Sequence, residues 1–311
     1  MKDIFSQLIT KRRDLAKMIS RVESDSEQDQ DVAEDLVVAA FKKCQHTSLS
    51  IGRVIAVTGA PGAGKSTLIN AYGMFLADQG FKVAVLAVDP SSLISSGAIM
   101  GDKTRMLDLA RHPNAFIRPI PSGAGHLGGM SSKTEDIIII LKAAGYDYIF
   151  LETIGVGQNE VDGCLVADHV IMVVPPASGD DIQAVKRGNL EFSDLIIVNK
   201  FDGETQVLAQ STASDYQSSL GHAKKVVLVS SQNRIGFDVV HAILGNLPRS
   251  IADQRQLLKH RVEKMVLSEI MKIPEVSQMY DLVLQKEGPT RSKATLFINN
   301  LKKLLTKEPQ I

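Results

Sequence analysis

The chain carries Gly59-Ala60-Pro61-Gly62-Ala63-Gly64-Lys65-Ser66, which matches the pattern G-x-x-x-x-G-K-[ST] of a phosphate-binding loop. The apolar run 53–58 before it predicts a buried strand, and residues 66–77 after it carry apolar side chains at helical spacing. A strand, this loop and a helix in that order are the context in which the pattern binds phosphate. The alternative is a glycine-rich turn that holds a lysine by chance, and the flanking pattern disfavours it.

The loop predicts its ligands from its chemistry. The glycines let successive backbone N–H groups converge on phosphate oxygens at the start of a helix. The Lys65 ammonium can reach the β- and γ-phosphates, and the Ser66 hydroxyl can hold Mg²⁺. We therefore expect a nucleoside triphosphate with Mg²⁺ to be bound by Gly59, Ala60, Pro61, Gly62, Ala63, Gly64, Lys65 and Ser66.

Composition limits the class of protein. The 311 residues have 35 basic and 35 acidic side chains, so no excess of positive charge predicts a nucleic-acid or membrane partner. Cys44 and Cys164 stand far apart in sequence, which is typical of a reducing compartment. No apolar run approaches the roughly 20 residues that span a bilayer, and the chain does not open on an apolar signal core. We expect a cytoplasmic protein.

From residue 51 onward, short apolar runs alternate with predicted helices. The runs are continuous, as expected for parallel strands buried on both faces. The alternation predicts an α/β fold with a mostly parallel, doubly wound sheet. The predicted strands are 54–58, 83–88, 148–151, 170–174, 195–198 and 226–229, and the predicted helices are 66–77, 103–110, 133–144, 181–191 and 206–219. The stretch 89–132 is rich in Gly, Ser and Pro, and we expect little regular structure in it.

Helical extensions flank this central part. Residues 1–46 have an apolar stripe at helical spacing, which predicts helices packed on the main domain. Apolar residues also recur at helical spacing within 251–272 and 294–305, with Pro274 between them. We therefore predict three parts, an N-terminal extension over 1–46, a nucleotide-binding domain over 47–248 and a C-terminal helical arm over 249–311.

Asn199-Lys200-Phe201-Asp202 follows a predicted buried strand and fits the base-reading pattern N-K-x-D. The Asp202 carboxylate can accept two hydrogen bonds from the N1–H and the exocyclic amine of guanine. Adenine has no such donor pair, and a site built on a specific polar pair rejects an analogue that lacks it. We expect Asn199 and Lys200 to brace the loop and to cover the base, so the predicted nucleotide is GTP or GDP. The alternative is a solvated turn.

Acidic residues at strand ends predict a metal site. Glu152 ends the strand 148–151 and opens Glu152-Thr-Ile-Gly155, where an acid orients Mg²⁺ and the Gly155 N–H contacts the γ-phosphate. Asp89 ends another strand, and acids at the carboxyl ends of neighbouring strands are placed for a metal–phosphate centre. Asp102, in the segment 101–105, could close over phosphate and metal as a switch. For each of these acids, the alternative is a helix cap or turn former.

These motifs resemble the GTPase chaperones of adenosylcobalamin-dependent acyl-CoA mutases, the methylmalonyl-CoA mutase-associated GTPase family. Similar sequences have also been described as arginine/ornithine transport-system kinases. The matching segments are Gly59–Thr67, Leu86–Ser92, Gly101–Met106, Asn114–Pro119, Leu127–Gly129, Glu152–Gln158, Gly179–Asp180, Lys186–Gly188 and Asn199–Asp202. The chain departs from the family pattern at Asn159, where Ser is usual, at Ser230-Ser231, where Ser-Ala is usual, and at His126.

The resemblance implies particular roles for these residues. It implies that Mg²⁺ and the hydrolytic water are surrounded by Ser66, Asp89, Asp102 and Glu152, and that the catalytic residues are Lys65, Asp102, Glu152 and Lys186. It adds Thr67, Ser230 and Ser231 to the nucleotide contacts. It also implies that the segments 92–106, 155–162 and 177–188 are switches that sense the nucleotide.

The resemblance further implies partners. The C-terminal helices would form a homodimer, and the switches would gate cofactor loading or protection on an acyl-CoA mutase, with methylmalonyl-CoA mutase as the expected enzyme. Two other functions stay open. One is a kinase that transfers the γ-phosphate to a small molecule or a protein, although the Asn199–Asp202 motif disfavours ATP. The other is a maturation GTPase for a nickel-type metal centre, although the histidines and cysteines do not cluster.

Overall fold

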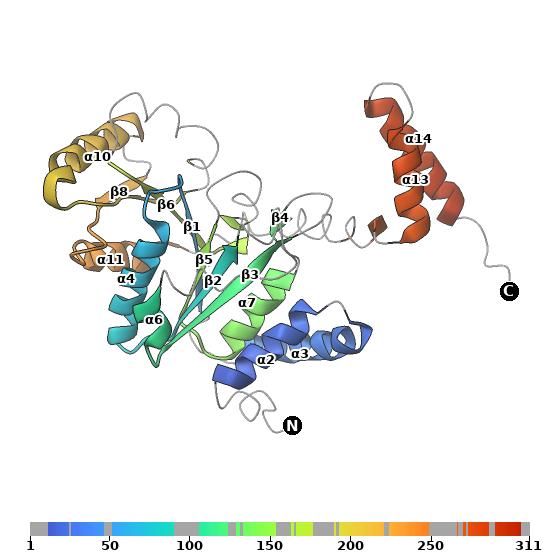
Figure 1. Cartoon of the computed structure of the whole chain (residues 1–311), viewed down its shortest axis with the longest axis horizontal. Coiled ribbons are helices and arrows are strands. Elements are labelled where there is room, and N and C mark those ends of the chain that lie inside the picture. Colours follow the sequence, from blue (N-terminus) through green and yellow to red (C-terminus); the bar gives the residue numbers. More distant parts are fainter. Residues whose placement is uncertain are drawn as a thin grey trace. The chain divides into compact units, whose positions relative to one another are not determined.

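The computed structural model divides the chain into two compact units, Met1–Arg249 and Ser250–Ile311 (Figure 1). The residues that the structure describes are 12–24, 26–46, 52–89, 106–123, 129–130, 133–153, 163–164, 166–176, 190, 193–220, 224–248, 266, 270–271, 273–285 and 290–305. The predicted three-part division, with boundaries at residues 46 and 248, remains a prediction.

The first unit is built around an eight-stranded sheet with the order β4-β3-β2-β5-β1-β6-β7-β8. All neighbouring pairs are parallel except β3 and β4, so the predicted α/β fold with a mostly parallel sheet is confirmed. The strands are β1 (Arg53–Thr58), β2 (Val83–Asp89), β3 (Ala115–Gly123), β4 (Gly129–Met130), β5 (Tyr148–Glu152), β6 (His169–Val174), β7 (Leu195–Val198) and β8 (Lys225–Leu228).

The expectation of little regular structure between residues 89 and 132 is wrong for part of that stretch. The helix α6 (Leu107–Arg111) overlaps the helix predicted over 103–110, whereas the nine-residue strand β3 was not predicted. Pro119 and Pro121 obscured the strand in the sequence, because proline has no N–H to donate to a sheet. β3 tolerates them because it lies near the sheet edge, with β2 on one side and only the two-residue β4 on the other.

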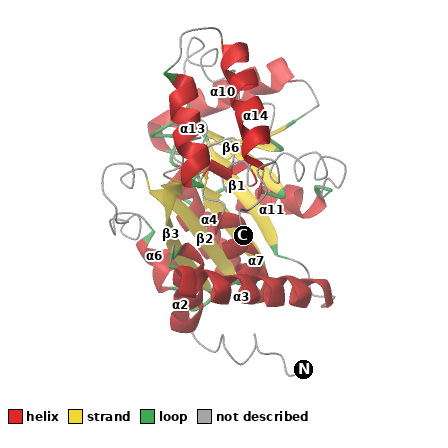
Figure 2. Cartoon of the chain, turned by 90° about the vertical axis from the view of Figure 1, so that its right-hand side faces the viewer, coloured by secondary structure: helices red, strands yellow, loops and turns green. Residues whose placement is uncertain are grey.

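Helices cover both faces of the sheet (Figures 1 and 2). Ile55 and Val57 of β1 pack in one core cluster with α4 (Lys65–Asp78), α6 and α11 (Phe237–Asn246). Val54 and Ala56 belong to a second cluster with α7 (Lys133–Ala143). Because successive side chains of a strand point to opposite faces, these clusters lie on the two sides of the sheet. A third cluster packs α10 (Gln206–Leu220) against β6 and β7.

The N-terminal stripe packs on this unit, as predicted. It lies on α2 (Arg12–Glu23), where Leu15, Ile19 and Val22 are buried, and α3 (Glu27–His46) follows it. Both helices lie beside α7 in the two views of the chain (Figures 1 and 2). The guanidinium of Arg118 on β3 donates to the Glu23 carboxylate, and Lys133 Nζ donates to the carbonyl oxygens of Glu23 and Ser24, both at 2.9 Å. These cations stabilise the carboxyl end of α2, where the helix dipole is negative.

Aspartates directly before three strands fix the register at the amino edge of the sheet. The Asp168 N–H donates to the Val54 carbonyl at 2.8 Å, and its carboxylate accepts the Val54 N–H at 2.8 Å. Asp147 makes the same pair of bonds with Lys82, and Asp194 makes it with Val170. Each aspartate thus joins its own strand to the neighbouring strand by two hydrogen bonds.

The second unit contains α13 (Pro274–Leu284) and α14 (Thr290–Leu305). Pro274 was expected to separate two helices, and it occupies the first turn of α13, where its missing N–H leaves no bond unmade. Val276 and Val283 are buried, and the rings of Tyr280 and Phe297 meet edge to face at 5.4 Å. Most of the predicted helix over 251–272 lies outside the described residues. Among the described helices, none has the length and apolar character needed to cross a membrane.

Candidate nucleotide-binding site

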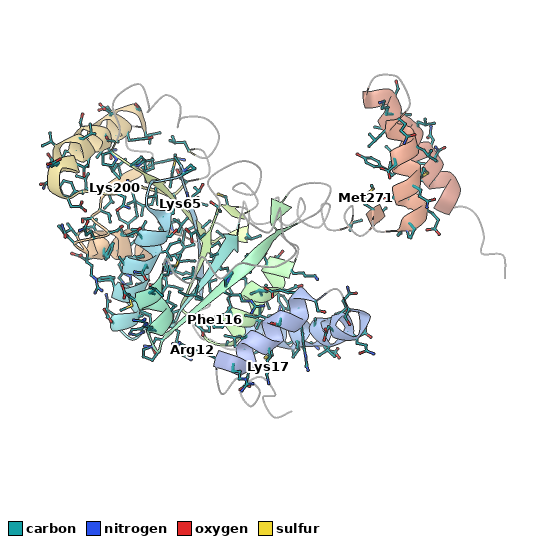
Figure 3. All side chains as sticks on the ribbon, in the orientation of Figure 1. Arg12, Lys17, Lys65, Phe116, Lys200 and Met271 are labelled. Carbon is teal, nitrogen blue, oxygen red and sulfur yellow. The ribbon has the colours of Figure 1, made fainter. Side chains whose placement is uncertain are left out.

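The phosphate-binding loop joins the central strand β1 to α4, which begins at Lys65. β1 lies between β5 and β6, so the loop leaves the carboxyl edge of the sheet near its middle. In open α/β sheets, ligands bind at this edge, where the strand order reverses. Figure 3 labels Lys65 and Lys200 at this end of the unit, away from Arg12, Lys17 and Phe116.

Two glycines of the loop are required by their surroundings. Gly59 has φ 137°, and a Cβ there would lie 2.0 Å from the carbonyl oxygen of Val173. Gly64 has φ 92°, and a Cβ there would lie 2.5 Å from Asn199 Nδ2. A side chain at either position would therefore combine an unfavourable backbone conformation with a collision. At these two positions the loop lies closer to its neighbours than a residue with a Cβ would allow.

Lys65 is buried, and its ammonium is held by the loop itself. Its Nζ donates to the carbonyl oxygens of Gly59 at 2.6 Å and of Ala60 at 3.2 Å. The positive charge therefore sits within the curve of the loop. A phosphate group bound there would offer it stronger, charged acceptors than these carbonyls.

Ser66 and Glu152 meet beside the loop. The Ser66 hydroxyl donates to Glu152 Oε1, and Glu152 is only 9% exposed. Glu152 ends β5 in register with Val57 of β1 and Ala87 of β2, which places it between the phosphate loop and the end of β2. A hydroxyl and a carboxylate are hard oxygen donors, and this pair fits Mg²⁺. The structure therefore brings together two of the four predicted metal ligands.

The structure describes the other predicted metal and catalytic residues only in part. Asp89 ends β2 two residues after Ala87, so its main chain lies at the same edge as Glu152. Its side chain is outside the described part of the structure, and so are Asp102, Gly155 and Lys186. The predicted switch segments 155–162 and 177–188 also lie outside the described residues, as does 92–106 except for Met106.

Asn199 connects the base-reading motif with the phosphate loop. It is 2% exposed, and its Nδ2 donates to the carbonyl oxygens of Ala63 at 3.2 Å and Gly64 at 3.4 Å. Its Oδ1 accepts the Ser231 hydroxyl at 2.7 Å and the Ser231 N–H at 3.3 Å. One amide thus holds three loops, those after β1, β7 and β8. These contacts agree with the expectation that Asn199 braces the loop, whereas coverage of the base by Lys200 stays a prediction.

Asp202 is held by Ser230. The Ser230 hydroxyl donates to Asp202 Oδ2, and the N–H of Phe201, within the same motif, donates to the Val229 carbonyl at 3.0 Å. Lys200 is exposed and has φ 59°, a left-handed conformation that non-glycine residues seldom adopt. Ser230 and Ser231, whose roles came only from the resemblance, therefore contact the motif residues Asp202 and Asn199.

Thr205 was not predicted, although it contacts the same motif. It ends the short helix η2 (Gly203–Thr205), and its hydroxyl lies 2.6 Å from the Lys200 carbonyl oxygen and 2.8 Å from that of Asp202. The only signal in the sequence is a hydroxyl residue three positions after Asp202. That spacing is common, so it could not single the residue out.

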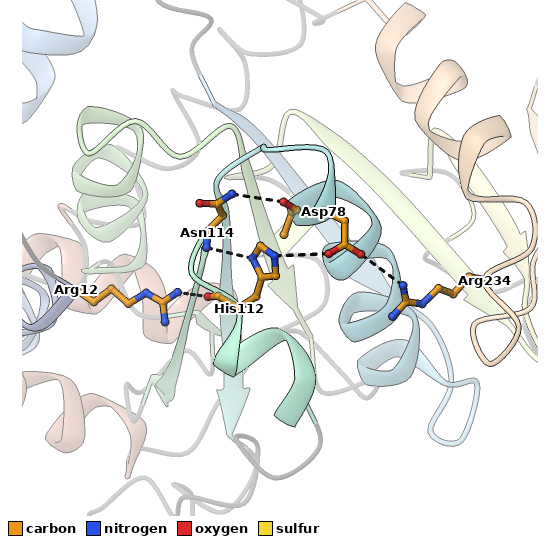
Figure 4. Close-up of polar contacts among 6 residues, drawn as sticks. Arg12, Asp78, His112, Asn114 and Arg234 are labelled. Atoms are coloured by element: carbon orange, nitrogen blue, oxygen red, sulfur yellow. Dashed lines mark hydrogen bonds and ion pairs between the residues drawn. The ribbon is translucent and has the colours of Figure 1, made fainter.

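Polar contacts join the base side of the site to the far end of α4 (Figure 4). Arg234 Nη1, in the turn after Ser231, lies 3.5 Å from Asp78 Oδ2 at the end of α4. Asp78 Oδ1 lies 3.6 Å from His112 Nε2, and His112 Nδ1 accepts the Asn114 N–H at 3.1 Å. The guanidinium of Arg12 on α2 donates to the His112 carbonyl. The N-terminal helices are thus linked through α4 to the turn beside Ser231.

The helix α6 is attached to α4 as well. The Leu109 N–H donates to Asn70 Oδ1 at 3.2 Å, and Gly73 leaves room for the Leu109 side chain, since a Cβ there would lie 2.6 Å from Leu109 Cδ2. Met106, just before α6, is fully buried. The chain that follows the predicted switch 92–106 is therefore anchored on the helix that carries Lys65 and Ser66.

The parallel sheet, the phosphate loop after its central strand and the N-K-x-D motif after β7 define the class as a P-loop GTPase. A family model described as methylmalonyl Co-A mutase-associated GTPase MeaB matches residues 15–273. The chain belongs to this family, so the resemblance drawn from the sequence is confirmed.

Relatives agree with this assignment. GTPase ArgK of Escherichia coli is 42% identical over 242 residues, which cover 75% of this chain and 71% of ArgK. A Mus musculus protein named methylmalonic aciduria type A homolog, mitochondrial, is 41% identical over 211 residues. That alignment covers 66% of this chain and 51% of the mouse protein, so the chain spans about half of that relative. The crystal structure of an LAO/AO transport system kinase has a TM-score of 0.70 at 27% identity, covering 97% of this chain and 99% of that chain.

Proposed function

We propose that this GTPase hydrolyses GTP with Mg²⁺ and acts as a chaperone that gates cobalamin loading or protection on an acyl-CoA mutase. The observation that carries the nucleotide part is the Asn199 side chain, which joins the base-reading loop to the phosphate loop. The partner is proposed from the family, whose name is mutase-associated. Methylmalonyl-CoA mutase is the first enzyme to test.

The proposed roles follow from the positions of the residues. Lys65 would leave the carbonyls of Gly59 and Ala60 and donate to the β- and γ-phosphates. Ser66 and Glu152 would hold the metal, directly or through water, together with Asp89 and Asp102. Mg²⁺ supplies neutralisation of the charge on the phosphates when it is bound. The Asp202 carboxylate, oriented by Ser230, would accept the two guanine donors.

Further residues complete the proposed site. Thr67 follows Ser66 on α4 and is exposed beside the loop. The Gly155 N–H would contact the γ-phosphate. Lys186, in the proposed switch 177–188, would be a catalytic residue.

Hydrolysis would be read out through the switches 92–106, 155–162 and 177–188. Loops held by the γ-phosphate change their order when it leaves, and this change can be sensed by a bound enzyme. The burial of Met106 supports this proposal for the first switch, because one end of the segment is fixed on the core around α4. We also propose a homodimer through the C-terminal helices, a cytoplasmic location, and no nucleic-acid or membrane partner.

The test is release of phosphate from GTP by the full chain, with and without methylmalonyl-CoA mutase. We expect slow turnover of GTP, little turnover of ATP, and faster GTP turnover when the mutase is present. Lys65→Ala should abolish turnover, whereas Lys225→Ala, at the exposed start of β8, should keep it. If the chain neither binds an adenosylcobalamin-dependent acyl-CoA mutase nor is stimulated by one, the proposed partner is wrong.

A kinase activity is the second candidate, and one observation favours it. The solved structure with a TM-score of 0.70 is that of an LAO/AO transport system kinase. Incubation with γ-labelled GTP, with arginine or a candidate protein as acceptor, separates the two functions. A hydrolase releases all the label as inorganic phosphate, whereas a kinase transfers it to the acceptor.

A further inference from the structure

The turn after the base-reading motif is closed by Thr205. Its hydroxyl lies 2.6 Å from the Lys200 carbonyl oxygen and 2.8 Å from the Asp202 carbonyl oxygen, and its N–H donates to the Asp202 carbonyl at 3.2 Å. A hydroxyl has one hydrogen to donate, so the two carbonyls share it. The residues on both sides of Phe201 are thus tied to one side chain.

This turn has a backbone that is difficult to maintain without such contacts. Lys200 has φ 59° and Gly203 has φ 51°, so the chain enters the left-handed region twice within four residues. For Lys200 this conformation is unfavourable, because its Cβ crowds the following carbonyl. Between these two residues Asp202 is extended, with φ −154° and ψ 160°. The direction of the Asp202 side chain therefore depends on Lys200 keeping a conformation that is uncommon for lysine, whereas Gly203 adopts a positive φ readily.

Asp202 is held at both ends. Ser230 donates to its carboxylate, and Thr205 binds its carbonyl oxygen. The main chain around Asp202 is also held by the Phe201 N–H, which donates to the Val229 carbonyl, and by the Thr205 N–H. The Thr205 hydroxyl adds a side-chain bond that restrains the carbonyls of both Lys200 and Asp202.

We propose that Thr205 is a positioning residue for guanine recognition, which its hydroxyl serves by fixing the Asp202 carboxylate for bidentate binding. This role rests on the proposed function, in which Asp202 reads the base. Two parallel hydrogen bonds need a closer alignment than one does. Loss of the hydroxyl therefore lowers the affinity for a base with both donors more than the affinity for a base with one donor.

Inosine nucleotides make this difference measurable, because hypoxanthine keeps the N1–H of guanine and lacks the exocyclic amine. The experiment is titration calorimetry of the full chain with GDP, IDP and ADP. It compares the wild-type chain, the isosteric Thr205→Val, and Thr205→Ser, which keeps the hydroxyl. The matched control is Thr212→Val, because the Thr212 hydroxyl also donates to a carbonyl, that of Leu208 at 2.8 Å, within α10.

We expect Thr205→Val to lower the affinity for GDP by about 3- to 10-fold, which is the usual contribution of one hydrogen bond. The affinity for IDP should fall less, so the preference for GDP over IDP becomes smaller. Thr205→Ser should restore both values, and Thr212→Val should leave both unchanged. Thr205→Ala serves in the same comparison if the valine variant does not fold, since it cannot overfill the turn.

An unchanged preference for GDP over IDP in Thr205→Val overturns the positioning role, even if both nucleotides weaken equally. That result leaves the proposed GTPase site intact, provided that the wild-type chain prefers GDP to ADP. A wild-type chain that binds ADP as tightly as GDP overturns the guanine site and the role of Thr205 together.

Discussion

The side-chain nitrogen of Asn199 lies 3.2 Å from the carbonyl oxygen of Ala63, so the loop that would read the base is bonded to the loop that would bind the phosphates. The same side chain accepts the Ser231 hydroxyl at 2.7 Å. Because Asn199 is 2% exposed, water cannot easily replace these bonds. Binding at either end of the nucleotide should therefore be sensitive to Asn199, although its side chain is assigned no chemical step.

Replacement of Asn199 by alanine should leave Ser231 and the Ala63 carbonyl without their buried partner. We expect the free energy of unfolding to fall by about 2–3 kcal/mol and the affinity for GDP to fall with it. Thermal denaturation and GDP titration measure the two effects. Asn246→Ala is the matched control, because Asn246 is exposed and donates only within α11, to the Ala242 carbonyl at 3.0 Å. Equal stability of the two variants would contradict the bracing role.

Replacement of Asp202 by asparagine should change which base is accepted. The amide can donate to the second carbonyl of xanthine, whereas it repels the exocyclic amine of guanine. We expect affinity for GDP to fall by about 10- to 100-fold, the worth of a hydrogen bond to a charged group, and affinity for XDP to rise. Titrations with both nucleotides test this. An unchanged affinity for GDP would show that Asp202 does not contact the base.

Replacement of Gly59 by alanine should disrupt the start of the phosphate loop. The new Cβ would meet the Val173 carbonyl on the main chain of β6, which cannot move aside as a side chain could. Overpacking and the positive φ together should destabilise the fold by about 3 kcal/mol or more. Gly245→Ala is the control, because a Cβ at this position of α11 meets nothing within 4 Å. That substitution should stabilise the chain by about 0.5–1 kcal/mol, since alanine favours a helix.

The sequence predicted the sheet where burial alone determines the strand. β1, β5, β6 and β7 are buried on both faces, so each is a continuous apolar run that can be recognised without knowing its neighbours. β3 could not be recognised in the sequence, because a strand that contains Pro119 is possible only where it lies near the sheet edge. That place is a property of the whole sheet and not of the segment.

The candidate site shows the same division. Ser66 and Glu152 were each predicted to serve Mg²⁺, Ser66 from the phosphate-loop motif and Glu152 from its place at a strand end, and the structure shows that they meet. The role of Thr205 could not be predicted, because it depends on the left-handed conformation of Lys200, which lysine rarely adopts. Residue type and spacing therefore predict which groups meet, whereas the contacts that orient them depend on main-chain conformation.

Asp136 provides a prediction for the dependence of stability on pH. It lies in the first turn of α7, where burial, and then the neighbouring Glu135 carboxylate, raise the pKa of its side chain to about 6 from 3.8. Since the folded chain binds this proton more tightly than the unfolded chain, the associated stability is fully present below about pH 4. It is lost as pH rises through about 6. Above that pH, the folded chain carries a charged and partly buried carboxylate.

Replacement of Asp136 by asparagine should remove this unfavourable charge. With allowance for solvent screening, we expect the free energy of unfolding at pH 7 to rise by about 1–2 kcal/mol. The decrease in stability between about pH 4 and 6 should become smaller. Urea denaturation at several pH values measures both effects. Asp238→Asn, in the exposed first turn of α11, is the matched control for the loss of a carboxylate near a helix N-terminus. If Asp136→Asn is no more stable than Asp238→Asn at pH 7, burial does not penalise the Asp136 carboxylate in the folded chain.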